Sequence, residues 1–359
     1  MRLKVIGNWR YSSYGRWTSL AFELKKSLQF SNDIILVDGA WGVGKSAVTP
    51  FVGAFKNVEK KRIDPVFEYV AILNWLNKLD DDAASTLLSI YADYFTYHNQ
   101  IGREVNLRWS DDSGFRNSPG AFRYVARLFQ RDGDHVERKI DDTNPATLIV
   151  SDFAVIAPSP LHAALGDRLK FIEVVRHPLY LVNYWTHYLN DFRRAREFSL
   201  SSEYHDLRIP WMASEWAPEY LEASPFDRVL LLIARSQDLL LQSIGEFPKC
   251  LVIPFESFVI ETESWLQQIG RFLNRPLAYN TSRIMARHKL PRLNVSAGRP
   301  TNSRSWISAK DETEESVIRS LMGLVLKKGS KFCVDEFVAA IGKYQSLFPT
   351  NVPDFRTLI

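Results

Sequence analysis

The stretch Ile34–Val48, IILVDGAWGVGKSAV, constrains the fold of this chain more than any other. An apolar run is followed at once by a glycine-rich turn, which matches the pattern GxxxxGK[ST] at Gly39, Gly44, Lys45 and Ser46. A turn of this kind between a strand and a helix directs several backbone N–H groups to one point, which is also the positive end of the helix dipole. The sequence therefore predicts a phosphate-binding loop after a buried strand.

The predicted ligand-binding residues of this loop form one continuous run, because backbone amides hold most of the ligand: Gly39, Ala40, Trp41, Gly42, Val43, Gly44, Lys45, Ser46 and Ala47. The glycines allow unusual backbone angles and a close approach to the ligand. Lys45 can reach a terminal phosphate or sulfate oxygen, and Ser46 can ligate Mg²⁺ in a nucleoside-triphosphate site. The loop alone does not distinguish a kinase, an NTPase and a sulfotransferase, because all three use the same cradle.

Short apolar runs alternate with longer helical patterns along the chain, which is typical of an α/β fold with a parallel sheet. Each expected strand is a short apolar run, as a strand buried on both faces should be: Ile34–Val37, Thr147–Val150, Lys170–Val175 and Cys250–Pro254. The expected helices are Lys45–Phe55, Ser118–Asp132, Leu179–Arg196, Phe226–Ile244, Ser264–Leu273 and Glu314–Leu326. We therefore expect a P-loop three-layer fold with a central, mostly parallel sheet flanked by helices.

No linker clearly divides the 359 residues, so one domain over residues 1–359 is expected. Helical insertions are expected at about 56–145 and about 186–225, and a C-terminal helical extension at about 306–359. Arg108–Pro119 and Pro291–Ser305 are rich in turn-forming residues and are expected to be loops or lids.

Composition narrows the classes of function. The net charge is only +4, which does not indicate a nucleic-acid partner. The two cysteines, Cys250 and Cys333, lie far apart and cannot form a disulfide framework or a CxxC metal pair, and no metal site is expected. The N-terminus has no apolar leader and no window is long and apolar enough to span a membrane, so a cytoplasmic location is expected.

A second landmark is the segment Lys170–Tyr188, KFIEVVRHPLYLVNYWTHY, which predicts a strand, then Arg-His-Pro, then a helix. Here the chain resembles the PAPS-dependent sulfotransferases, in which a strand ends in Arg-X-Pro and a Ser follows eight residues after the Arg. The resemblance implies that Arg176 and the residue at the Ser position hold the 3′-phosphate of the donor. That residue is Tyr184 in this chain, and a Tyr hydroxyl can also donate to a phosphate.

The resemblance continues in Cys250–Leu277, where the family has a strand, an acidic residue and a helix that ends in Phe-Leu; the matching residues are Glu256, Phe272 and Leu273. The following segment Thr281–Lys310 contains seven Lys and Arg residues and no Asp or Glu. It falls where the family has a loop that covers the 3′-phosphate. The residues implied for this contact are Arg292, Gly298 and Arg299.

The resemblance implies transfer of a sulfuryl group from PAPS to a hydroxyl of a small-molecule or glycan acceptor, with 3′,5′-ADP as product. Lys45 would stabilise the developing charge. The proton acceptor is left open between Asp64, which opens a segment like that of the glycan-modifying branch, and His162, since the cytosolic branch uses a His after an equivalent strand. Asp152 is a further candidate, directly after the strand Thr147–Val150.

Two other functions stay open, because this loop matches every fixed position of the GxxxxGK[ST] pattern, whereas the loop of sulfotransferases usually departs from that pattern. One is an ATP- and Mg²⁺-dependent kinase, in which Asp152 would be the acidic Mg²⁺ ligand at a strand end. The other is a nucleotide-binding module without enzymatic activity. Fold analogy does not decide among these functions.

Overall fold

The computed structural model describes residues 23–26, 30–103, 105–109, 114–118, 120–130, 134–191, 200–247, 249–295 and 313–349. Its centre is a five-stranded sheet with the order β2-β3-β1-β4-β7 and parallel pairing throughout. The strands are β1 (Ile34–Asp38), β2 (Arg62–Ile63), β3 (Thr147–Val150), β4 (Leu169–Val175) and β7 (Cys250–Pro254). The four expected strands are confirmed, and the short edge strand β2 is additional.

The central place of β1 in the sheet explains why Ile34–Val37 is an unbroken apolar run. Ile34 of β1 pairs with Thr147 of β3 on one side and with Leu169 of β4 on the other. The side chains of β1 are buried on both faces of the sheet, so every position of the run is apolar until Asp38. Because β1 is buried on both faces, it lacks the alternation of apolar and polar residues that a half-exposed strand would have.

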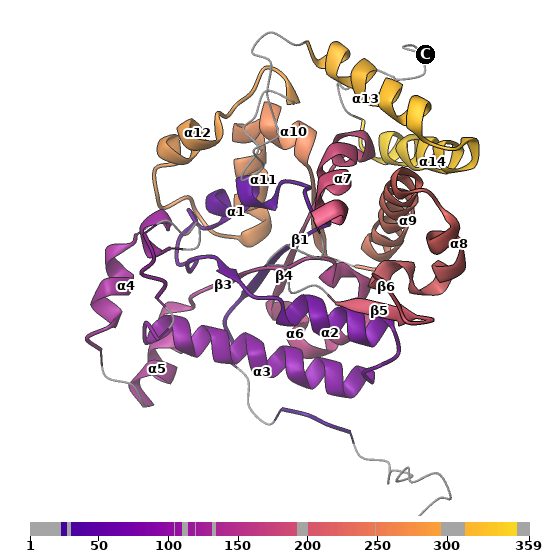
Figure 1. The fold of residues 1–359 in the computed structure, drawn as a ribbon. Helices are drawn as coiled ribbons and strands as arrows, with labels where there is room; N and C mark the ends of the chain where they lie inside the picture. Colours follow the sequence, from indigo (N-terminus) through magenta and orange to yellow (C-terminus); the bar gives the residue numbers. More distant parts are fainter. Residues whose placement is uncertain are drawn as a thin grey trace, which may run out of the picture.

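Helices cover both faces of the sheet (Figure 1). One face carries α2 (Val66–Trp75), α3 (Asp81–Gln100) and α6 (Pro158–Leu165), and the other carries α1 (Lys45–Val52), α10 (Phe255–Ile260), α11 (Thr262–Leu273) and α12 (Ser282–His288). A further group packs beside these: α7 (Val182–Asp191), α9 (Pro225–Gly245), α13 (Glu314–Lys328) and α14 (Lys331–Leu347). The predicted α/β class, with a central parallel sheet flanked by helices, is confirmed.

The remaining elements are shorter. They are α4 (Phe122–Arg127), α5 (Asp134–Thr143), α8 (Ala217–Glu222), an antiparallel hairpin of β5 (Ser201–Tyr204) and β6 (Leu207–Pro210), and 3-10 turns that include Ala154–Ile156 and Pro178–Leu181. The hairpin lies inside the region 186–225 that was expected to be a helical insertion, so that region is not wholly helical. The division of the chain into one domain with insertions stays a prediction.

Three helices differ from their expected bounds by three residues or more. The helix after the loop ends at Val52 instead of Phe55, because the chain turns there and Phe55 bridges to Leu277. The helix expected over Ser118–Asp132 is α only from Phe122, since Gly120 has a φ of 66° that interrupts it. The helix expected over Leu179–Arg196 begins as a 3-10 turn and is α from Val182 to Asp191; residues 192–199 lie outside the described residues.

The order of the strands decides where a ligand can bind. The chain places β2 and β3 on one side of β1, then crosses to place β4 and β7 on the other side. The carboxyl end of β1 is therefore the point at which the strand order reverses, and ligands of open α/β sheets bind at such a point. Among the helices that the structure describes, none is both long enough and apolar enough to cross a membrane.

Candidate functional site

The predicted phosphate loop joins β1 to α1 at the carboxyl edge of the sheet, and its glycines have positive φ angles: 144° at Gly39, 78° at Gly42 and 105° at Gly44. At Gly42 and Gly44, glycine is required both by the backbone angles and by the lack of space for a side chain. A Cβ atom at Gly42 would lie 2.6 Å from the ring of Tyr184, and one at Gly44 would lie 2.2 Å from the ring of Phe255. The rings of Tyr184 and Phe255 therefore pack directly against the loop backbone, which is possible only because Gly42 and Gly44 have no side chains.

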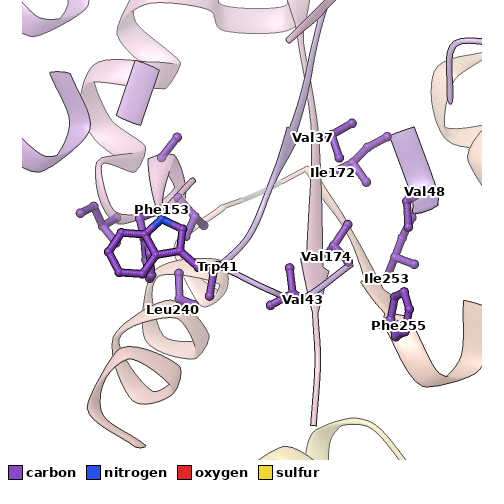
Figure 2. Packing of buried hydrophobic residues seen from close by; sticks show 14 of the residues in the cluster. Val37, Trp41, Val43, Val48, Phe153, Ile172, Val174, Leu240, Ile253 and Phe255 are labelled. Carbon is purple, nitrogen blue, oxygen red and sulfur yellow. The ribbon is translucent and has the colours of Figure 1, made fainter. Parts of the chain in front are cut away.

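The apolar residues of the loop anchor it to the core. The side chain of Trp41 is buried and packs edge-on against Phe153, and Figure 2 shows Trp41 and Val43 among the buried side chains of the core. The indole of Trp185 donates a hydrogen bond of 3.0 Å to the carbonyl oxygen of Trp41. These contacts fix the loop backbone. The predicted roles of Ala40, Trp41, Val43 and Ala47 are thus limited to their backbone groups, since their side chains are buried.

The opposite side of the loop is open. Gly42, Gly44 and Lys45 are half-buried, and Ser46 is exposed. No hydrogen bond between described residues uses the backbone N–H of Gly42, Val43 or Gly44. Unpaired N–H groups at the start of a helix are suited to hold an anion, because the helix dipole adds to their partial charges. The residues present therefore fit a phosphate or phosphosulfate group.

The ammonium group of Lys45 folds back over the loop. Its Nζ donates to the carbonyl oxygens of Gly39 at 2.6 Å and Ala40 at 2.9 Å, and it forms an ion pair with Asp152. Asp152 stands two residues beyond the end of β3, and its side chain is 30% exposed while that of Lys45 is 10% exposed. An anion that enters the loop must compete with this carboxylate for the ammonium group.

Two further carboxyl groups lie behind Lys45 in the core. Asp38 and Glu173 are opposite one another on β1 and β4 and are fully buried. Burial raises the pKa of Asp38 to about 6 although Lys45 opposes this, and burial together with the charge of Asp38 raises the pKa of Glu173 well above its usual value. The sequence analysis did not identify these two residues as part of the site.

A pair of guanidinium groups lies beside the loop. Arg176, at the end of β4, donates from Nη1 to the carbonyl oxygen of Gly42 at 2.9 Å. The guanidinium carbon of Arg176 lies 4.7 Å from the centre of the Phe255 ring, and that of Arg292 lies 5.6 Å from it. The Nε atom of each arginine is buried and has no hydrogen-bond partner among the described residues. Burial lowers the pKa of both arginines, and the nearby charge of Arg176 helps to bring that of Arg292 to about 10.

The two neighbouring cations each keep an unused Nε donor, while Nη1 and Nη2 of Arg292 also donate to the carbonyl oxygens of Val295 at 3.2 Å and His288 at 3.3 Å. Each guanidinium presents a planar set of N–H groups that matches phosphate, sulfate or carboxylate. An anion between Arg176 and Arg292 would relieve their mutual repulsion and satisfy their free donors. The arginine pair on the shared ring of Phe255 is therefore the candidate for a second anion site next to the loop.

The segment after β4 is held in place by the C-terminal helices. Glu256 accepts a hydrogen bond from the backbone N–H of His177 at 3.0 Å and another from the hydroxyl of Tyr344, on α14, at 2.7 Å. Tyr180 donates to the carboxylate of Glu314 at the start of α13. Burial raises the pKa of Glu256, while the nearby positive charge of Arg176 opposes that rise. The matched acidic residue Glu256 therefore positions the backbone that carries Arg176.

Of the residues predicted to bind the donor, the structure brings Lys45, Arg176, Tyr184 and Arg292 to the loop or to Phe255. The ring of Tyr184 lies against Gly42 and stacks on that of Tyr188, with centroids 5.9 Å apart. Gly298 and Arg299 lie outside the described residues.

The two predicted proton acceptors lie elsewhere. Asp64 follows β2, and its carboxylate accepts hydrogen bonds from Arg62 at 3.0 Å and from the backbone N–H of Val66, the first residue of α2, at 3.2 Å. It is at the same edge of the sheet as the loop, but β3 lies between β2 and β1. Its observed contacts are those of a residue that begins a helix.

His162 is on α6, and its ring contacts Phe247 with centroids 5.0 Å apart. Phe247 in turn packs on Phe171, in the amino-terminal half of β4. Because the loop lies beyond the carboxyl ends of the strands, the structure does not bring His162 to Lys45. The carboxylate that does contact Lys45 is Asp152.

Sequence reasoning missed Phe255, Asp38 and Glu173. Phe255 directly follows the strand CLVIP, where an aromatic residue reads as core. Asp38 and Glu173 each interrupt or end an apolar run, IILVD and KFIEVV, and a charge inside such a run is the signal that could have found them. In the part of the chain that the structure describes, no group of three or more His, Cys, Asp or Glu residues is arranged to hold a metal ion.

Fold and site together describe an α/β protein with a glycine-rich loop of the phosphate-binding pattern and an adjacent arginine pair. No family model matches the chain, and no curated protein matches it. Solved structures of sulfotransferase domains, the family that the motifs resemble, are similar to it. The domain from the Synechococcus PCC 7002 olefin synthase has 11% identity and a TM-score of 0.40, and the match covers 90% of this chain and 98% of that one.

Two further sulfotransferases are similar to the chain. The domain from the curacin biosynthetic pathway has 13% identity and a TM-score of 0.39, with 90% of this chain and 100% of that chain covered. Sulfotransferase STF9 from Mycobacterium avium has 9% identity and a TM-score of 0.37, with 89% and 78% covered.

Proposed function

We propose that this chain is a sulfotransferase-like enzyme that moves a sulfuryl group from PAPS to a hydroxyl group of a saccharide or another small polar acceptor. The observation that carries the proposal is the arginine pair, Arg176 and Arg292, on the ring of Phe255. PAPS carries a 5′-phosphosulfate and a separate 3′-phosphate, so it needs two anion sites. ATP has one chain of phosphates and would leave the arginine pair without a ligand.

The contact between Arg176 and Gly42 makes the two anion sites continuous. One nitrogen of the guanidinium group is fixed to the loop backbone at 2.9 Å, while the buried Nε has no partner among the described residues. A single ligand can thus contact the loop through its 5′-substituent and Arg176 through its 3′-phosphate. The free donors of Gly42, Val43 and Gly44 fit the first group, and Arg292 completes the second.

The residues of the loop have separable roles in the transfer. The backbone N–H groups orient the phosphosulfate, and Lys45 stabilises the charge that develops on the leaving phosphate and on the sulfuryl oxygens. A carboxylate takes the proton of the acceptor hydroxyl. Contact with Lys45 favours Asp152 for this step, and the position at the same edge of the sheet keeps Asp64 as the second candidate. His162 has no comparable support.

A second candidate function, an ATP- and Mg²⁺-dependent kinase, is favoured by a specific observation. The loop has every residue of the GxxxxGKS pattern, and Asp152 stands at a strand end beside Lys45, where a kinase would hold Mg²⁺. In this case the arginine pair would bind another part of the substrate. A nucleotide-binding module without activity would use the same contacts and would lack turnover.

A panel of nucleotides, scored by the shift in melting temperature, separates these functions. We expect 3′,5′-ADP to stabilise the protein without Mg²⁺ and more strongly than 5′-AMP, because only 3′,5′-ADP fills both anion sites. Stabilisation by ATP only, and only with Mg²⁺, would contradict the proposal and support the kinase. Stabilisation by 3′,5′-ADP without transfer to any acceptor would support the module.

A further inference from the structure

A pair of carboxyl groups lies inside the core, behind the phosphate loop. Asp38 ends β1 and faces Glu173 of β4 in the parallel register, so both side chains leave the same face of the sheet. Oδ2 of Asp38 accepts a hydrogen bond of 2.8 Å from the backbone N–H of Val155. Oδ1 of Asp38 and both carboxyl oxygens of Glu173 are buried and meet no other donor among the described residues, so the hydrogen bond open to the pair is the one between the two carboxyl groups, which requires a proton on one of them.

The charged groups around Asp38 come from each neighbouring element. Lys45 of α1 attracts its charge, and Asp152 after β3 and Glu173 of β4 repel it. On the far side, burial raises the pKa of the thiol of Cys250, at the start of β7, and the nearby Glu173 adds to that rise. Three carboxyl groups thus share one ammonium group, and two charged, unpaired carboxylates in a dry core would be very costly.

The simplest charge balance leaves Glu173 protonated while Asp38 titrates near neutral pH. Burial is the largest cause of the raised pKa of Asp38, about 6, and Lys45 is the largest opposing influence. When the ammonium group of Lys45 pairs with another anion, its charge no longer lowers the pKa of Asp38 as strongly. The pKa of Asp38 would then rise.

We propose that Asp38 and Glu173 are positioning residues for Lys45, and that they take up a proton when an anion binds the phosphate loop. The inference rests on the proposed function only in that the loop must bind an anion. In the ligand-free protein the ionised Asp38 helps to hold Lys45 over the loop. In the bound protein Lys45 faces the ligand, and the protonated pair remains neutral behind it.

The direction in which anion affinity changes with pH follows from this proton uptake. Because the pKa of Asp38 is higher with the anion bound than without it, binding takes up a proton. The affinity for the anion is therefore low above the bound-state pKa, rises as the pH falls through that value, and levels off below about pH 6. Each unit of difference between the two pKa values corresponds to about a tenfold change in affinity.

Inorganic sulfate is the probe of choice, because it does not titrate in this range and any proton must go to the protein. The apparent Kd for sulfate follows from the melting temperature as a function of sulfate concentration. We expect the wild-type Kd to fall about tenfold between about pH 8 and about pH 6. The double variant Asp38→Asn, Glu173→Gln should lose this dependence, because neither amide takes up a proton.

The matched control is Asp227→Asn, which changes a buried carboxylate at the start of α9, away from the loop. It should keep the wild-type dependence. The inference is wrong if the double variant shows the same dependence as the wild type, or if the wild type binds sulfate equally at all pH values. Absence of sulfate binding at every pH would instead overturn the phosphate site itself, and with it the proposed function.

A second measurement needs neither a ligand nor the double variant. The titration of Asp38, followed by the ¹³C resonance of its carboxyl carbon, should move to higher pH in Lys45→Met, since the attraction of the ammonium group is removed. An unchanged titration would refute the coupling between these residues. A merely structural role of Asp38 would not produce the shift.

Discussion

Arg176 donates a hydrogen bond of 2.9 Å from Nη1 to the carbonyl oxygen of Gly42, and so ties the end of β4 to the loop after β1. The same guanidinium group packs on Phe255, which follows β7. Three segments far apart in the sequence therefore meet at one arginine. This contact fixes the distance between the loop and the arginine pair, which a ligand with two separate anionic groups requires.

The first prediction concerns the arginine pair. Arg176→Ala and Arg292→Ala should each weaken binding of 3′,5′-ADP about 10- to 100-fold, because a hydrogen bond between charged groups contributes about 1.5–3 kcal/mol. Binding of 5′-AMP should change far less, since it lacks the 3′-phosphate. Calorimetric titration with both nucleotides measures the difference.

The matched control is Arg283→Ala, an exposed arginine of the same basic segment, on α12. It should leave both affinities unchanged. If Arg176→Ala weakens 5′-AMP and 3′,5′-ADP equally, the arginine does not contact the 3′-phosphate.

The second prediction concerns Lys45. Lys45→Ala should reduce turnover of PAPS, followed as release of 3′,5′-ADP, by about 10²–10³-fold, the usual effect of removing one preorganised charge donor. The variant should remain folded, because Lys45 is at the start of α1 and Asp152 remains partly exposed to solvent. Its melting temperature near neutral pH should fall modestly, since no ammonium group then offsets the charge of the buried Asp38. Lys56→Ala, an exposed lysine shortly after α1, is the control. Turnover that survives in Lys45→Ala would refute the catalytic role.

The third prediction concerns the space under the loop. Gly44→Ala should lower the free energy of unfolding by about 2 kcal/mol or more, because an alanine at φ 105° is strained and its Cβ would overlap the ring of Phe255. Gly245→Ala, at the end of α9 with no atom within 4 Å of the added Cβ, should be neutral or slightly stabilising. Chemical denaturation measures both variants, and equal effects would mean that Phe255 does not support the loop.

The fourth prediction concerns stability as a function of pH. The pKa of Asp38 is raised in the folded protein from 3.8 to about 6, so its contribution to stability is fully present below about pH 3.8 and is lost as the pH rises through about 6. The loss amounts to about 3 kcal/mol, since one unit of pKa corresponds to about 1.4 kcal/mol. Asp38→Asn can still accept the hydrogen bond from Val155 and does not ionise.

The variant Asp38→Asn should therefore be more stable than the wild type at neutral pH, and the difference should shrink as the pH falls toward 4. Denaturant unfolding at several pH values gives this difference directly. A constant difference across the range would show that folding does not raise the pKa of Asp38.

The individual strands of the sheet were predictable because their signals are local. The apolar runs of β1, β3, β4 and β7 are consequences of burial on both faces, and the phosphate loop is encoded by glycines whose backbone angles other residues rarely adopt. Arg176 was predictable for the same reason, since it directly follows a strand whose end lies at the edge where ligands bind. His162 was misplaced relative to the loop, because the sequence does not reveal that α6 carries it to the cluster of Phe247 and Phe171.

By itself, the sequence determined the class of fold and the position of the glycine-rich loop after β1, because both depend on residues that are neighbours in the chain. Only the tertiary structure decided that Arg176 and Arg292 share the ring of Phe255, and that Asp152 rather than His162 contacts Lys45. It also decided that Asp38 faces Glu173. These contacts join residues of different strands, and strand order and register, which no local pattern encodes, set the distances between them.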